Sequence, residues 1–252
     1  TARSVLEPGA SSWGAREVGG QVQVVFERAV KVTLKDIERD MGTRVRKGGA
    51  SHDRRSGNFA CASFTHYLAR PVGGEPDPHL HSHNFIFNVT WDPEEKVWKA
   101  GQFVNLHLDR PYYEACFETR LAMAMRELGY AIERRGNQWD LAGMSKAFLD
   151  KFSRRTAEVE AEAKKRGITD PKRKAELGGK TRNKKGGNLD MDQLRGIWRD
   201  RMSSRDHREI AEVLERARDE MGQNPGGIPP DRDRIHESLV YSLAKSFEKN
   251  SV

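Results

Sequence analysis

The sequence predicts an α+β fold in which helices pack on one face of an antiparallel, palm-like sheet, with a basic helical region following it. Apolar residues recur every three or four positions in some segments and every second position in others, which indicates both helices and strands. These segments do not alternate strictly, and a mixed order favours an antiparallel sheet over a parallel one. Basic residues gather in the C-terminal half, where helical spacing prevails.

The first element is a helix over residues 21–41, because Val22, Phe26, Ala29 and other apolar residues recur there at helical spacing. The segment TRVRKGG follows it and breaks the pattern. Residues 58–70 and 81–91 are rich in aromatic and β-branched residues and predict two strands. A turn at Asp92–Glu94 leads into a third predicted strand, KVWKAGQFVN, at residues 96–105.

The next predicted helix begins near Asp109 and Pro111 and ends at Gly129, since proline favours the first turn and glycine the end of a helix. A hairpin follows at residues 130–143. Beyond Ser145 the pattern is helical, and the predicted helices lie at residues 190–202, 205–221 and 234–249.

The charge balance favours a polyanionic partner. The net charge is +7, and residues 164–185 hold ten basic and two acidic side chains. Cys61 and Cys116 are isolated, which fits a reducing compartment and excludes a disulfide framework. The chain has no apolar run of membrane-spanning length and no signal peptide, so we expect a cytoplasmic protein.

Three of the eight histidines lie in one short stretch, PDPHLHSHNFIFN, where His79, His81 and His83 occupy alternate positions. On a strand, alternate side chains share a face, so His81 and His83 lie on one face that continues into Phe85, Phe87 and Val89. An edge position with ordinary hydrogen bonds is the simpler explanation. Two imidazoles about 6–7 Å apart at their Cα atoms can also share a metal ion.

The third ligand is expected across the sheet. His79 and His83 lie about 13 Å apart along a strand, too far for one ion to bind both together with His81. If the preceding strand pairs antiparallel through residues 71–78, His66 lies opposite His81 and His83. Three imidazoles with open positions suit a catalytic more than a structural site, and imidazole alone does not select the metal.

The stretch FTHYLARPVGGEPDPHLHSHNFIFNVTW, with YAIERRGNQWDLAG and FSRRTAEVEAEAKKRGI after it, resembles the conjugative relaxases of the TrwC/TraI type, within the HUH endonuclease group. The resemblance implies a five-stranded antiparallel palm and a metal bound by His66, His81 and His83. It further implies nicking of one DNA strand at a plasmid transfer origin through a phosphotyrosine intermediate. The divalent ion would be magnesium or manganese in function, with zinc or nickel as alternatives in the purified protein.

The resemblance also implies what is missing. No tyrosine stands at the nucleophile's place, since Tyr112 and Tyr113 open a helix and are expected to pack. The family's N-terminal strand is not matched, so this polypeptide is expected to be inactive alone. We expect a relaxase domain at 1–165, a basic helical connector at 166–233 and the start of a truncated helicase-like domain at 234–252.

The implied partners are single-stranded DNA and the DNA hairpin of a transfer origin, with accessory proteins of conjugation as further partners. Phosphate contacts need cations, and the candidates are Arg44, Arg46, Lys47, Arg70, Arg154 and Arg155. A solvated surface position is the alternative for each. Two other functions remain open at this point: a non-catalytic DNA-binding remnant of a relaxase, and an unrelated three-histidine metallohydrolase.

Overall fold

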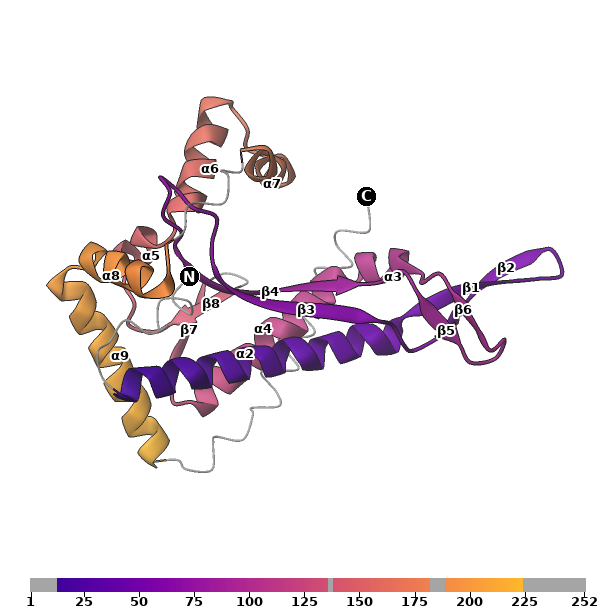
Figure 1. The fold of residues 1–252 in the computed structure, drawn as a ribbon, viewed down its shortest axis with the longest axis horizontal. Coiled ribbons are helices and arrows are strands. Elements are labelled where there is room, and N and C mark those ends of the chain that lie inside the picture. The colour runs from indigo at the N-terminus through magenta and orange to yellow at the C-terminus, as the bar shows by residue number, and fades with distance from the viewer. Residues whose placement is uncertain (1–12, 136–137, 182–188, 224–252) are drawn as a thin grey trace. The chain divides into compact units, whose positions relative to one another are not determined.

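The computed structural model describes residues 13–135, 138–181 and 189–223, and these form the predicted α+β fold (Figure 1). They fall into two compact units. The first holds residues 66–81 and 128–223 with the start of the first helix, and the second holds residues 23–65 and 82–127. Each unit is described separately below. No helix among the described residues is both long and apolar enough to cross a membrane.

The second unit is built on helices with a shared apolar core. Helix α2 runs over Trp13–Asp40, α3 over Phe103–Leu108 and α4 over Arg110–Glu127. Met41, Leu106 and Tyr113 form a buried cluster, against which Ile37, Phe59 and Ile86 pack. Helices therefore cover the sheet face that carries Ile86, as the sequence predicts.

The strands form separate antiparallel pairs. In the second unit β1 (Gly42–Lys47) pairs with β2 (Ala50–Arg55), and β5 (Thr90–Asp92) pairs with β6 (Val97–Lys99). The strands β3 (Cys61–Leu68) and β4 (Pro78–Ile86) form a third pair. The described residues thus hold two-stranded pairs rather than one continuous five-stranded palm, because each short strand pairs with its neighbour in a hairpin.

Two strand predictions are wrong in part. Residues 103–105 of the predicted third strand belong to α3, since the extended segment ends at Gly101 and Gln102 caps the helix. The predicted strand at 81–91 is broken between β4 and β5, where the Val89 amide turns back to the Phe87 carbonyl at 2.7 Å. The helix expected at 234–249 and the domain expected at 234–252 lie outside the described residues.

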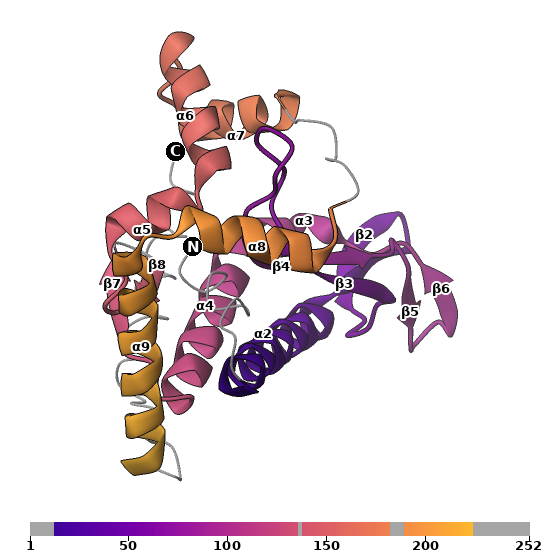
Figure 2. The ribbon, with the colours of Figure 1, turned by 60° about the vertical axis from the view of Figure 1, so that its left-hand side comes forward.

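The first unit contains the β7–β8 hairpin, the loop end of the β3–β4 pair and a group of helices (Figure 2). Its elements are β7 (Ile132–Arg135), β8 (Gln138–Leu141), α5 (Lys146–Lys151), α6 (Arg154–Lys165), α7 (Pro171–Lys180), α8 (Met191–Arg201) and α9 (Ser204–Gln223). Side-chain caps begin three helices: Ser145, Asp170 and Asp190 each accept a backbone amide. Leu141 and Phe148 are fully buried and anchor the hairpin and α5.

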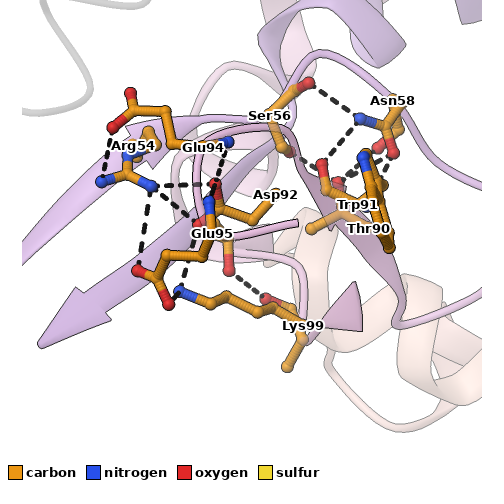
Figure 3. Close-up of polar contacts among 11 residues, drawn as sticks. Arg54, Ser56, Asn58, Thr90, Trp91, Asp92, Glu94, Glu95 and Lys99 are labelled. Atoms are coloured by element: carbon orange, nitrogen blue, oxygen red, sulfur yellow. Dashed lines mark hydrogen bonds and ion pairs between the residues drawn. The ribbon is translucent and has the colours of Figure 1, made fainter. Parts of the chain in front are cut away.

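A buried carboxylate ties β2 to the β5–β6 hairpin in the second unit (Figure 3). Asp92 is fully buried and accepts Arg54 Nη1 at 2.8 Å and Lys99 Nζ at 3.1 Å. Although burial opposes its ionisation, hydrogen bonds from Arg54, Lys99 and two backbone amides hold the pKa of Asp92 well below its ordinary value. Folding therefore favours the ionised carboxylate.

This pKa shift predicts a loss of stability in acid. A carboxylate whose pKa is lower in the folded state stabilises the fold above its unfolded pKa of about 3.9, and the contribution falls as the pH drops further. We expect the free energy of unfolding to decline below about pH 4. Urea unfolding of Asp92→Asn between pH 7 and pH 3 should show a flatter decline, and an unchanged decline would contradict this role. The stability of the variant should still depend on pH to some extent, because the pKa values of Asp206 and Glu209 are also lowered.

Candidate metal centre and nucleic-acid interface

The structure brings His66 and His81 together, as antiparallel pairing of their strands predicts. The Ala69 amide donates to the Asp77 carbonyl at 2.9 Å, and this bond joins the end of β3 to the residue before β4. The rings of His66 and His81 stack with their centroids 5.4 Å apart and their planes 24° apart. Both side chains therefore leave the hairpin on the same face.

One hydrogen bond defines the tautomer of His81. Its Nδ1 lies 2.8 Å from the backbone carbonyl oxygen of His79. A carbonyl can only accept, so Nδ1 carries the proton and the lone pair lies on Nε2. Metal-binding histidines commonly donate one ring N–H to a carbonyl in this way while the other nitrogen binds the ion. The chemistry of His81 thus fits a metal ligand.

His79 and His83 lie on β4 at the positions two residues before and two residues after His81. The ring of His79 stacks on that of His81 with centroids 4.6 Å apart. His83 is exposed and shares the strand face of His81, because one residue separates them on an extended strand. Among the described residues, no group of three or more His, Cys, Asp or Glu side chains is arranged to hold a metal. Stacked imidazoles present ring faces rather than lone pairs to each other, so metal binding requires side-chain rotation.

The phenylalanines next to the histidines on β3 and β4 are exposed. Phe64, Phe85 and Phe87 are 58%, 62% and 46% exposed. The core lies against Ile86, whose side chain leaves the opposite face of β4. The rings of Phe85 and Phe87 pack edge to face, with their centroids 5.0 Å apart. Exposed aromatic rings of this kind provide surfaces on which nucleobases stack.

Arg44, Arg46 and Lys47 lie on β1, in a hairpin that the sequence reasoning missed. Gly48 and Gly49 form its two-residue turn with positive φ angles of 60° and 80°. Paired glycines between extended segments are a signal for such a turn as well as for the end of a helix. All three cations are exposed, and Arg44 forms an ion pair with Asp53 at 3.4 Å.

The other predicted phosphate ligands lie in the first unit. Arg70 follows β3 and is partly buried. Arg154 bonds to Asp77 and to the Glu75 carbonyl, while Arg155 bonds to Glu158, the Gly178 carbonyl and Thr181. Both guanidinium groups therefore have roles within the protein, and their contact with DNA stays a prediction. Residues 182–185 of the basic run lie outside the described part of the chain.

Three of the described tyrosines have raised pKa values. Tyr113 is buried and donates to Asp40 Oδ2 at 3.1 Å, and burial together with this bond raises the pKa of Tyr113. Burial likewise raises the pKa of Tyr130 to about 12. A hydrogen bond with Cys116 raises the pKa of Tyr112. Tyr67 follows His66 directly and so leaves the other face of β3.

Comparison with known proteins identifies the family. Residues 10–205 match the model of the TrwC relaxase family. A multifunctional conjugation protein TraI of Escherichia coli is 28% identical over 153 residues, which is 56% of this chain and 8% of TraI. The chain therefore matches only a small part of that relative's length.

Two solved structures share the fold. TrwC complexed with a 27-mer DNA that comprises the recognition hairpin and the cleavage site matches with a TM-score of 0.69 and 24% identity, over 84% of this chain and 71% of the other. A metal-bound structure of the conjugative relaxase TrwC with OriT DNA matches with a TM-score of 0.67 and 24% identity, over 82% and 69% of the two chains.

Proposed function

Because the chain belongs to the TrwC relaxase family, we propose that it binds the hairpin and single strand of a plasmid transfer origin and serves the nicking and strand transfer carried out there. The observation that carries this proposal is the pairing of His66 and His81 on one face of the β3–β4 hairpin. Membership of the family removes an unrelated three-histidine metallohydrolase as an alternative.

The proposed metal ligands are His66, His81 and His83. The Nδ1–H of His81 is held by the His79 carbonyl, which supports binding through Nε2. A divalent cation there would neutralise phosphate charge and orient the phosphodiester. Magnesium or manganese suits this role in function, and imidazole ligands also accept zinc or nickel.

The chain's own residues supply the contacts to DNA. Phe64, Phe85 and Phe87 are exposed rings on which unpaired bases can stack. Arg46 and Lys47 lie beside the turn of the β1–β2 hairpin, and a two-stranded ribbon of this kind can enter a DNA groove. We assign Arg44 and Arg70 to the same set of phosphate contacts, with Arg44 partly neutralised by Asp53.

The attacking tyrosine is proposed to lie outside the described residues. Tyr113 and Tyr130 are buried with raised pKa values, so neither forms a phenolate readily at neutral pH. This placement favours a second candidate function for the polypeptide taken alone, which is DNA binding without cleavage.

The β1–β2 hairpin gives the test of DNA binding. We expect Arg46→Ala/Lys47→Ala to weaken binding to a transfer-origin hairpin with a single-stranded extension about tenfold, because two phosphate contacts are lost. The slope of log affinity against log salt should fall by about 1.5 for the same reason. Fluorescence anisotropy over a salt series measures both quantities.

The matched control is Lys31→Ala/Lys35→Ala, which removes two exposed cations from α2. This variant should keep the wild-type slope. If the hairpin variant also kept it, the β1–β2 hairpin would have no part in phosphate binding.

A further inference from the structure

We propose that Asp77 and its two arginine partners, Arg154 and Arg201, form a clamp that fixes the register of β4 against β3 and so positions His81 beside His66. This clamp lies entirely within the first unit. The inference rests on the proposed metal site, to which it adds positioning residues.

The loop between β3 and β4 is itself ordered by short-range bonds. Val72 and Glu75 exchange both backbone hydrogen bonds, at 3.1 and 3.3 Å. Gly73 and Gly74 turn the chain between them with φ angles of 63° and 88°, which only glycine adopts without strain. The loop is therefore a tight turn whose returning arm leads through Pro78 directly into the histidine strand.

Asp77 connects this arm to two helices. Its side chain is only 4% exposed. One carboxylate oxygen accepts Arg154 Nε at 2.8 Å and Arg201 Nη1 at 2.6 Å, and the other accepts the Arg154 backbone amide at 3.0 Å. That amide is one of the donors left unpaired at the start of α6. A buried carboxylate needs such partners, and removing one leaves a charge that the interior does not tolerate.

The two residues before Asp77 are held by the same helices. Arg201 Nη2 lies 3.0 Å from Glu75 Oε2, and Arg154 Nη2 donates to the Glu75 carbonyl at 2.7 Å. Trp198 Nε1 donates to the Pro76 carbonyl at 2.9 Å. Three consecutive residues of the loop are thus bound by α6 and α8.

Register is the property that this clamp controls. The Asp77 carbonyl accepts the Ala69 amide, so the pairing of β3 and β4 begins at Asp77; the Phe87 amide donates to the Ala60 carbonyl in a register shifted by one residue, which is the register that places His81 opposite His66. A slip of one residue would move every side chain of β4 to the opposite face, and His81 would leave the face of His66. His81 lies four positions after Asp77, which is about 13 Å along a strand. Fixing Asp77 therefore fixes the face on which His81 appears.

The test compares Arg201→Met with a matched break elsewhere in the unit. Arg201→Met removes the bonds to both Asp77 and Glu75, and we expect the affinity for Co²⁺, used as a spectroscopic probe, to fall about tenfold, at the low end of losses seen for residues that orient metal ligands. Arg201→Lys keeps the charge but cannot bridge two carboxylates. Its affinity for Co²⁺ should therefore lie between that of the wild-type protein and that of Arg201→Met. This conservative variant also carries the test if the methionine variant does not fold.

The control is Lys151→Met, which breaks the ion pair to the buried Asp206 without touching the loop. It should lower the melting temperature, as Arg201→Met does, and leave the Co²⁺ affinity unchanged. Wild-type affinity in Arg201→Met and Arg201→Lys would overturn the clamp. A different result would contradict the proposed metal site itself. In that case the wild-type protein would bind no Co²⁺, or His66→Ala would bind Co²⁺ as tightly as the wild-type protein does.

Discussion

Replacing His66 with alanine should weaken the binding of a divalent cation by at least about 100-fold, since losing a direct ligand exceeds the 10- to 100-fold cost of losing a residue that only orients one. His81→Ala and His83→Ala should have effects of similar size. Each variant leaves only two of the three proposed imidazole ligands, and without His66 both remaining rings come from β4. Titration calorimetry with Mn²⁺ or Co²⁺ measures the loss.

Two other histidines serve as controls. His79→Ala keeps the backbone carbonyl that accepts Nδ1–H of His81, so the tautomer of His81 survives and the affinity should stay near the wild-type value. His52→Ala changes an exposed residue of β2, in a different hairpin. If His79→Ala were as damaging as His66→Ala, the ligand set would be wrong. If all variants bound equally well, the site would lie elsewhere.

The pairing of His66 with His81 could be predicted from the sequence because it depends on local rules. Strand alternation places His81 and His83 on one face, and a short turn between two strands forces antiparallel pairing. The stop of α4 near Gly129 follows from an equally local rule. These features need no knowledge of distant parts of the chain.

Other features depend on contacts that a local pattern does not contain. The exposure of Phe85 follows from which face of β4 meets Leu106 and Tyr113, and periodicity describes both faces equally well. The interpretation of Arg154 as a phosphate ligand could not include Asp77, which lies 77 residues earlier in the chain. The β1–β2 hairpin is different, because its Gly48–Gly49 signal was present in the sequence.

Gly129→Ala should destabilise the protein by at least about 2 kcal/mol, through a contact of this long-range kind. Gly129 has a φ of 80°, and a Cβ atom there would lie 2.0 Å from the backbone carbonyl oxygen of Ala217 in α9. A backbone atom cannot rotate away, so α9 must move or Gly129 must change its conformation. Urea unfolding monitored by circular dichroism measures the change in the free energy of unfolding.

Gly167→Ala separates the two causes of that loss. Gly167 follows α6 in the same unit with a φ of 62°, and nothing lies within 4 Å of the Cβ that alanine would add. The control therefore pays only the conformational cost of a left-handed alanine, about 1 kcal/mol. The difference between the two variants then reports the contact with Ala217. Equal losses would mean that α9 does not pack on Gly129, and that the helix stop alone explains this glycine.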